Sequence, residues 1–279
     1  MNIPLILSQI FIYPVKSLGG IALTHAQVEQ RGLRYDRRWL IIDDNNVFVT
    51  QRRHPQMALI EVAIVENGLQ LHHRTQDVTD LLVPFQPERL DLVTVTIWDD
   101  QVEAVVVNDA ANDWLTEVLG FSARLVYLPD SSPRPVDRKY APFEADVSFA
   151  DGYPFLIIGQ SSLDDLNTRL QDSVSVVRFR PNFVFEGGSP YEEDQWYEFT
   201  IGDVLFYGVK PCVRCILTTV NPETGEMSGK EPVRTLSNYR RRNNKIFFGQ
   251  NLLTQQAGAI KIGNQIRVLS HIVRLTMSE

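Results

Sequence analysis

The chain has 279 residues, 44% hydrophobic and 22% charged, a composition typical of a soluble globular protein with one large or two modest domains. Its formal net charge of −7 argues against non-specific binding to a nucleic acid polymer, but leaves room for a local basic pocket. No apolar run is long enough to span a bilayer, no signal peptide is recognisable, and two cysteines do not make a secreted disulfide framework, so we expect a cytoplasmic protein without membrane contact.

The N-terminal part of the sequence predicts short strands separated by turns. Residues 8–15 are expected to form a strand that Pro14 ends. Residues 39–42 are expected to form a buried strand, and the turn Asp43-Asp44-Asn45-Asn46 leads to a hairpin partner at 47–50. Other short strands are expected at residues 21–28, 59–65, 69–72 and 92–98.

Two loops of this part carry candidate anion-binding residues. Lys16 and Ser17 follow the first strand and would present an ammonium and a hydroxyl group. Arg37 belongs to a stretch with four arginines in eight positions, and the rigid fork of arginine suits phosphate and carboxylate groups. The alternative is an exposed lysine in a turn and a solvated arginine loop paired with nearby acids.

A helix is predicted over residues 109–119, with Asn108 or Asp109 as its cap and Gly120 as its end. Strands are expected at 125–129 and 155–158, separated by a polar, proline-rich loop. A second helix is expected over residues 163–170, capped by Ser161 or Ser162. Hydroxyl groups at a helix N-terminus can bind an anion, although a plain N-cap is the more common explanation.

Residues 176–185 are expected to form a strand that Arg180-Pro181-Asn182 interrupts as a bulge or edge. Aromatic neighbours would desolvate Arg180 in part, so its guanidinium should need an anionic partner, which could be Glu193, Asp194 or a ligand.

The remaining sequence again favours strands over helices. A hairpin is expected from residues 196–201 and 204–209, a helix near 234–242, a strand at 247–252, and a last pair of barrel strands within 260–268. We therefore predict a mainly β fold with a few helices (α+β), rich in β-barrel structure.

Both cysteines of the chain, Cys212 and Cys215, lie in the stretch 210–228. Four interpretations are open: a redox dithiol, structural zinc, one thiolate that binds a metal held mainly by a cofactor, or two buried, inert thiols. The strand-like residues 216–220 do not suit the first, and the lack of further ligands does not suit the second. Arg214 and Lys210 would favour a thiolate and so support the third.

The cationic and hydroxyl-bearing candidates all lie at predicted strand ends, caps or bulges, and together they would suit a phosphate-bearing cofactor. They are Lys16, Ser17, Arg37, Ser161, Ser162 and Arg180.

Long stretches of the chain resemble the MOSC-domain molybdenum-cofactor proteins that carry an additional N-terminal β-barrel domain, a family that includes the mitochondrial amidoxime-reducing component and bacterial reductases of N-hydroxylated bases. The matching stretches occur in order along nearly the whole chain. They are IYPVKSLGG, RGLRYDRRWLIID, FVTQRRHPQMALI, YPFLIIGQSSLDDLN, RFRPNFVFEG and KPCVRCILTTVNPETGEMSGKEPVRTL.

The resemblance implies a MOSC N-terminal β-barrel domain over residues 1–122 and a MOSC domain over 123–279. It implies one molybdenum bound by one molybdopterin dithiolene and by Cys215, the second cysteine of the motif, whereas Cys212 would not bind the metal. The positions that match the family's cofactor-binding residues are Lys16, Ser17, Arg37, Arg180 and Asn182, with Ser161 and Ser162 as a weaker match. Arg214, between the two cysteines, is also expected at the cofactor.

The resemblance also implies the reduction of amidoximes, hydroxylamines or other N-hydroxy compounds. Many bacterial relatives carry a C-terminal iron–sulfur domain, but this chain has no cysteine after Cys215 and is expected to hold no such cluster. Electrons would then come from a separate redox protein of the ferredoxin, flavodoxin or flavoprotein-reductase kind. The alternative is a protein that carries molybdenum cofactor or sulfur without reducing a substrate.

Overall fold

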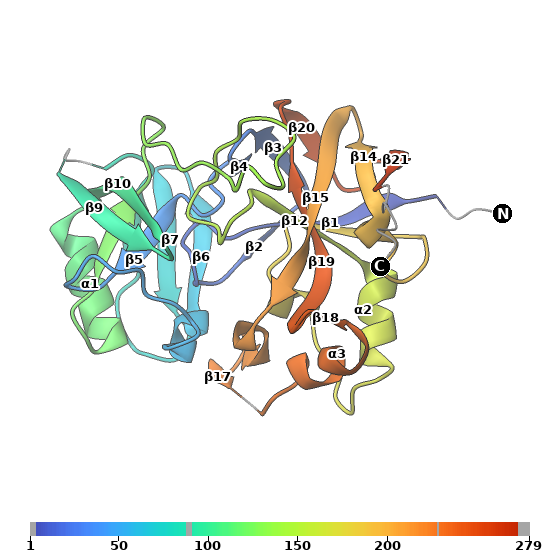
Figure 1. The fold of residues 1–279 in the computed structure, drawn as a ribbon. Coiled ribbons are helices and arrows are strands. Elements are labelled where there is room, and N and C mark those ends of the chain that lie inside the picture. Colours follow the sequence, from blue (N-terminus) through green and yellow to red (C-terminus); the bar gives the residue numbers. More distant parts are fainter. Residues whose placement is uncertain (1–3, 88–90, 228, 273–279) are drawn as a thin grey trace.

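The structure, a computed structural model, describes residues 4–87, 91–227 and 229–272. Most elements are β-strands, as predicted, and the largest sheet contains nine of them (Figure 1). Along this sheet the strands follow the order β2 (Ile21–Leu23), β1 (Ile6–Ile12), β13 (Phe183–Glu186), β12 (Phe155–Gly159), β19 (Lys245–Leu253), β15 (Val204–Arg214), β14 (Trp196–Ile201) and β21 (Ile266–His271), with β18 (Arg241–Arg242) beside β19.

Four smaller sheets accompany it. A four-stranded sheet has the order β5 (Trp39–Ile42), β11 (Arg124–Tyr127), β10 (Asp100–Val106) and β9 (Leu92–Ile97). Two sheets of three strands join β20 (Gly258–Lys261) to β3 (His25–Glu29) and β4 (Gly32–Leu33), and β6 (Ile60–Val65) to β7 (Gly68–His73) and β8 (Leu81–Pro84). The last is the hairpin of β16 (Val220–Asn221) and β17 (Glu226–Met227).

Three α-helices occur among the described residues: α1 (Asp109–Leu119), α2 (Gln160–Asn167) and α3 (Val233–Tyr239). Four short 3-10 helices join them: η1 (Pro55–Leu59), η2 (Val176–Phe179), η3 (Glu192–Gln195) and η4 (Ile216–Thr219). No helix in the described parts of the chain combines the length and the apolar character needed to cross a membrane.

Helix α1 has the predicted bounds because its end signals are local. The Asn108 side chain accepts a hydrogen bond from Ala111 N at 2.9 Å, and Gly120, at φ 77°, ends the helix in the left-handed conformation. Its apolar stripe, which includes Trp114 and Leu115, packs into the core of the N-terminal half.

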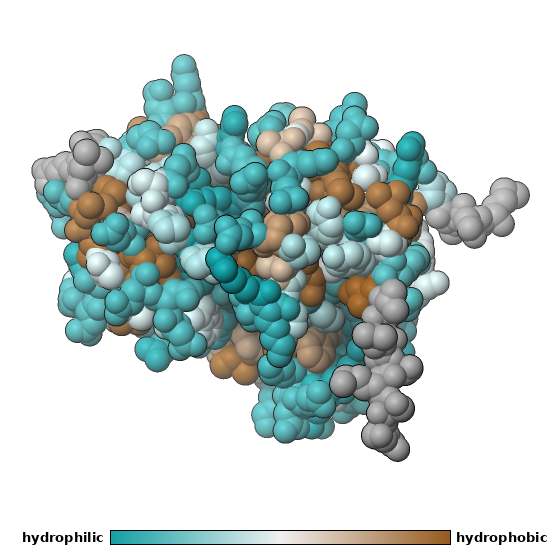
Figure 2. Space-filling view, turned by 45° about the horizontal axis from the view of Figure 1, so that its top comes forward, coloured by the Kyte–Doolittle hydropathy of each residue, from teal (hydrophilic) through white to brown (hydrophobic). Residues whose placement is uncertain are grey.

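The fully buried strand β12 joins two cores of the large sheet. Phe155 and Ile157 pack into one hydrophobic cluster, and Ile158 packs into the other, beneath α2. A strand buried on both faces reads as a continuous apolar run, which is why the sequence identified it. The face shown in Figure 2 is largely hydrophilic, with hydrophobic residues in small patches.

The two halves of the chain exchange strands. The first strand, β1, pairs antiparallel with β13 in the large sheet, whereas β11, which follows residue 122, pairs with β5 and β10 of the N-terminal half (Figure 1). Ile21 and Tyr35 pack against the main hydrophobic clusters of both halves. The division into domains 1–122 and 123–279 stays a prediction, and residues 1–3, 88–90, 228 and 273–279 of it lie outside the described part.

Three predicted elements differ in the structure. Residues 216–219 form the 3-10 helix η4 instead of a strand, and residues 176–179 form η2 before the strand β13 begins. Each of these runs is apolar but too short for its period to separate helix from strand. Residues 47–50 are no full hairpin partner, since only an isolated bridge links Phe48 to Ile42.

Two further expectations are wrong in detail. Helix α2 starts at Gln160 with Gly159 as its N-cap, so Ser161 and Ser162 lie inside its first turn and neither caps it. The last two strands do not pair with each other: β20 pairs with β3, and β21 pairs with β14. Local turn signals cannot reveal such long-range pairing. Ser228, which ends the cysteine-containing stretch, lies outside the described residues.

Candidate functional site

A cavity of about 200 Å³ lies where strand ends and loops from both halves of the chain meet. Its wall includes every residue that the sequence singled out for metal or cofactor binding except Ser161 and Ser162. These residues are Lys16, Ser17, Arg37, Arg180, Asn182, Arg214 and Cys215. Residues separated by almost 200 positions in the sequence therefore form one polar, largely cationic surface.

Cys215 follows β15 and stands directly before η4, where its thiol is half-buried at the cavity. The Cys215 carbonyl accepts hydrogen bonds from the backbone and the hydroxyl of Thr218, at 3.3 and 3.1 Å, which fix the turn. The Cys215 sulfur accepts a hydrogen bond from Arg52 Nε at 3.2 Å. No local sequence pattern marks Arg52 as a site residue.

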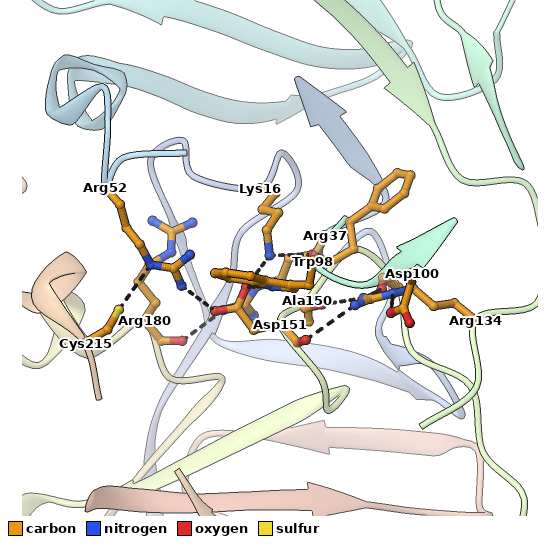
Figure 3. Close-up of polar contacts among 12 residues, drawn as sticks. Lys16, Arg37, Arg52, Trp98, Asp100, Arg134, Ala150, Asp151, Arg180 and Cys215 are labelled. Carbon is orange, nitrogen blue, oxygen red and sulfur yellow. Dashed lines mark hydrogen bonds and ion pairs between the residues drawn. The ribbon is translucent and has the colours of Figure 1, made fainter. Parts of the chain in front are cut away.

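Arg52 belongs to a connected group of charged side chains (Figure 3). Its Nη2 lies 3.1 Å from Asp151 Oδ2, and the other carboxylate oxygen, Oδ1, lies 2.5 Å from Lys16 Nζ. Trp98 Nε1 donates to Asp151 Oδ1 at 3.2 Å, and the Trp98 ring lies 4.3 Å from the Arg52 guanidinium carbon. The Asp151 carboxylate thus accepts from three donors, and one of them, Arg52, also contacts Cys215.

The electrostatics of this group follow from its burial and its charges. Burial lowers the pKa of the Lys16 ammonium to about 8, against the opposing effect of Asp151. Partial desolvation would raise the pKa of the Asp151 carboxyl, but the Lys16 and Arg52 cations outweigh it and hold this pKa below its usual range. Asp151 is therefore an anion at neutral pH, although its side chain remains 58% exposed.

Arg134 fixes the loop that carries Asp151. Its side chain is only 3% exposed and donates to the carbonyls of Ser148 and Ala150, at 2.8 and 2.5 Å. It also pairs with Asp100 at 2.9 Å, on the hairpin that carries Trp98 (Figure 3). Because these acceptors fix the buried guanidinium, Arg134 holds the loop and the hairpin in one position relative to each other.

A second carboxylate, that of the buried Asp36, holds residues of the cavity wall in place. It accepts hydrogen bonds from Tyr13 N at 2.7 Å, from Arg37 Nη1 at 2.6 Å and from Asn182 Nδ2 at 3.1 Å. Asn182 Oδ1 accepts from Leu156 N and from Arg37 Nη1. Both amide atoms of Asn182 are therefore engaged within the protein, and this side chain holds the wall in place.

Arg37 and Arg180 both lie over the Tyr13 ring, with guanidinium carbons 4.4 and 4.1 Å from its centroid. Arg180 donates through Nη1 to Leu18 O at 2.8 Å, but its buried Nη2 has no partner among the described residues. Burial lowers the pKa of Arg180 to about 10, so the group remains a cation. A buried guanidinium with an unsatisfied N–H is suited to an anionic ligand.

The backbone at three site residues is held in the left-handed region. Ser17, Arg37 and Arg180 have φ values of 70°, 51° and 53°. Each such conformation costs about 1–2 kcal/mol for an L-residue, and such costs concentrate at functional sites, where surrounding contacts enforce them. The Asp36 hydrogen bonds and the Arg180–Leu18 contact supply that enforcement here.

Arg214 and Cys212 complete the wall near Cys215. Arg214 Nε donates to Phe248 O at 2.8 Å and Nη1 to Phe179 O at 2.9 Å, whereas its buried Nη2 has no partner among the described residues. Burial raises the pKa of the Cys212 thiol, which makes it a poor nucleophile at neutral pH.

A second cavity, of about 510 Å³, shares Arg180 and Leu217 with the first. Its wall also includes Tyr13 and Arg178. The buried Tyr13 hydroxyl has no hydrogen-bond partner among the described residues, and burial raises its pKa to about 12, so it is a neutral donor. The wall of this second cavity carries charges of both signs, since it also includes Glu61 and Glu223.

Ser161 and Ser162 lie away from both cavities. Ser161 Oγ donates to Gly188 O at 3.1 Å. Ser162 is fully buried, and its Oγ lies 2.9 and 3.0 Å from the carboxylate oxygens of Glu193. The predicted partners of Arg180 are also engaged elsewhere, since Glu193 contacts Ser162 and Asp194 pairs with Arg240 at 2.6 Å.

The buried Glu193 predicts a pH-dependent stability. Burial raises its pKa from 4.5 to about 7, so the folded state binds this proton more tightly than the unfolded state does. The free energy of unfolding should therefore fall as the pH rises from about 4.5 to 7. We expect Glu193→Gln to remove this loss. The free energy of unfolding of the variant minus that of the wild type, measured by urea denaturation, should therefore be about 2 kcal/mol more favourable to the variant at pH 8 than at pH 5. An equal difference at both pH values, as expected for the control Glu192→Gln, would contradict this account.

The other interpretations of the cysteine pair find little support. Both cysteines are free. Within the described residues, no three His, Cys, Asp or Glu side chains gather as metal ligands, so a zinc site built by the chain alone has no ligand set. The helix after Cys215 is a single 3-10 turn, unlike the α-helix that follows the dithiol of redox proteins.

Two domain families match the sequence: the MOSC N-terminal beta barrel domain at residues 5–122 and the MOSC domain at residues 144–267. The chain is also similar to curated proteins over almost its full length. Mitochondrial amidoxime-reducing component 1 is 35% identical in Mus musculus and 36% identical in Homo sapiens, in each case over 94% of this chain and 82% of the relative. Mitochondrial amidoxime reducing component 2 of Homo sapiens is 34% identical over 93% of this chain and 82% of its own length.

Proposed function

The chain belongs to the MOSC-domain family of the mitochondrial amidoxime-reducing components, and from this premise we propose that it is a molybdenum-cofactor-dependent oxidoreductase that reduces N-hydroxylated substrates. The observation that carries the proposal is the meeting of Cys215 with Lys16, Arg37 and Arg180 at one cavity. A thiol ligand and a set of cations at one place are what a metal held by a phosphate-bearing pterin requires.

The residues present fit this cofactor. Buried N–H groups of Arg180 and Arg214 have no partner among the described residues, and neither does the Tyr13 hydroxyl. Leaving such groups unpaired is costly, and the phosphate and the heteroatoms of a pterin would satisfy them. The two cavities that share Arg180 offer the several hundred Å³ that a bound cofactor of this size occupies.

In this proposal Cys215 Sγ is the single protein ligand of the metal. Lys16, Ser17, Arg37 and Arg180 hold the phosphate and orient the pterin, and Arg214 lies beside the ligand cysteine. Asn182 acts through Arg37 and the backbone of Leu156, because its amide atoms are already engaged. When bound, the molybdenum cofactor supplies the two-electron redox chemistry, and the chain supplies binding, orientation and electrostatics.

The overall reaction breaks the N–O bond of the substrate and consumes two electrons and two protons, giving the amine or amidine and one water. In this proposal the electrons come from a separate donor protein. Cys215 is only partly buried, which supports the approach of a small substrate from solvent.

The test is to purify the protein from a host that makes molybdenum cofactor, to measure molybdenum per chain, and to assay benzamidoxime with a dithionite-reduced viologen dye. We expect close to one metal per chain and continuous formation of benzamidine. Metal-loaded protein without turnover would refute the enzyme. If that protein instead passed its cofactor to a metal-free molybdoenzyme, it would act as a carrier.

A further inference from the structure

Arg52 makes three directed contacts, although an arginine near the surface needs none of them to stay solvated. Its Nε donates to Cys215 Sγ at 3.2 Å, its Nη2 pairs with Asp151 Oδ2 at 3.1 Å, and its planar group lies 4.3 Å from the Trp98 ring (Figure 3). The side chain is 20% exposed. Arginine's rigid fork can satisfy a sulfur and a carboxylate at once, and lysine cannot.

The partners of Arg52 are themselves fixed. Trp98 packs on Phe48 with ring centroids 4.9 Å apart, and its backbone is in the left-handed region at φ 56°, which costs about 1–2 kcal/mol. Arg134 holds the loop of Asp151 through three carbonyls.

Arg52 and Trp98 both come from the N-terminal half, whereas Cys215 and Asp151 come from the C-terminal half. The contact therefore makes the environment of the sulfur depend on the N-terminal half. A guanidinium at this distance places a permanent positive charge against the sulfur and restrains its direction. Hydrogen bonds and charge at a ligand sulfur are general determinants of the affinity and the reduction potential of a bound metal.

We propose that Arg52 is a positioning residue for Cys215, held by Trp98 and Asp151, through which the N-terminal half directs the sulfur and places a positive charge beside it. The consequence for a bound metal rests on the proposed function. The consequence for the free thiol does not.

The first test uses metal-free protein and needs no enzyme activity. In a Cys212→Ser background, Cys215 is alkylated with iodoacetate, an anion, and with neutral iodoacetamide at one pH, and the ratio of the two rates is compared. This ratio cancels the fraction of thiolate and reports local charge. We expect Arg52→Met to lower the ratio about fivefold, as the loss of one unit charge near 4 Å predicts, and Trp98→Leu to lower it less.

The exposed neighbour provides the matched control, since Arg53→Met removes an equal charge one position away and should leave the ratio unchanged. Thermal melts check that each variant is folded. An Arg52→Met ratio equal to that of the wild type, in folded protein, would overturn the proposal. If Arg52→Met does not fold, Trp98→Leu decides the question. A Trp98→Leu ratio equal to that of the wild type would then contradict the proposal that Trp98 holds Arg52 in position.

The second test uses molybdenum-loaded protein and follows the paramagnetic Mo(V) signal during a redox titration. Removing the positive charge should disfavour the reduced metal, so Arg52→Met should lower the ratio of reduced to oxidised molybdenum at a fixed potential about tenfold, or about 59 mV for one electron. An unchanged potential would refute this effect on the metal. If the wild type bound no molybdenum, the proposed function would fail, and the alkylation ratio would still decide the role of Arg52.

Discussion

Replacing Cys215 by serine is expected to lower benzamidoxime turnover by more than about 100-fold and to reduce the molybdenum retained on purification. Serine keeps the shape of the side chain but replaces a soft thiolate with a hydroxyl group, which is a poor ligand for this kind of site. Residues that only support a metal ligand already contribute 10- to 100-fold, so the loss of the ligand itself should exceed that range. Turnover and metal content are measured on the same sample.

The chain offers a matched control three residues away. Cys212 also lines the cavity, but burial raises the pKa of its thiol, and the thiol makes a long contact, 3.8 Å, with the carbonyl of Val213. We expect Cys212→Ser to change turnover by no more than about twofold, because it removes no metal ligand. If both variants lost activity equally, the two cysteines would act as a pair, and the assignment of Cys215 as the single ligand would be wrong.

The second large effect concerns stability. Asp36→Ala is expected to lower the free energy of unfolding by about 3–5 kcal/mol, because it leaves the buried Arg37 cation and the Asn182 amide without their shared partner. The side chain of Asp36 is 1% exposed, so water cannot replace the carboxylate without rearrangement. Urea denaturation measures the change, and cofactor retention should fall with it, since Arg37 lines the cavity.

Asp130→Ala is the control for this experiment. Asp130 also pairs with an arginine, Arg38, at 2.7 Å, but its side chain is 88% exposed. Exposed ion pairs contribute at most about 1 kcal/mol, so a small effect is expected. Similar losses in the two variants would show that Asp36 does not organise the wall of the cavity.

The sequence predicted an element well where the signals that start and end it lie close to it in the chain. Asn108 and Gly120 define α1, and the continuous apolar run of β12 indicated a strand buried on both faces. The sequence-based prediction failed where an element depends on contacts with residues far away in the sequence. The turn between β20 and β21 resembles a hairpin, yet each strand finds its partner elsewhere, and η4 after Cys215 forms from residues with strand-like preferences.

The candidate site shows the same limit. Lys16, Ser17, Arg37 and Arg180 were recognisable as polar residues at strand ends and bulges, and they do line one cavity. Their binding of a cofactor remains our proposal. Ser161 and Ser162 are also polar residues at the end of a predicted element. They contact Gly188 and Glu193 instead of a cavity, because α2 begins at Gln160, before the two serines that were expected to cap it.

Arg52, Trp98 and Asp151 could not be identified from local pattern. Arg52 and Cys215 are 163 positions apart, and no motif links them. The signal available in the sequence was the matching stretch FVTQRRHPQMALI, which contains Arg52, but nothing in it separates this arginine from Arg53. Only the fold, by placing Trp98 and Asp151 around one of the two, makes the difference.

The most direct test of the central claim is a single turnover. Molybdenum-loaded protein is reduced, freed of excess reductant and mixed with benzamidoxime without any further electron donor, and the benzamidine formed is compared with the metal content. Our account predicts one benzamidine per fully reduced molybdenum and none from metal-loaded Cys215→Ser protein. Reduced, metal-loaded wild-type protein that leaves benzamidoxime unchanged would contradict it.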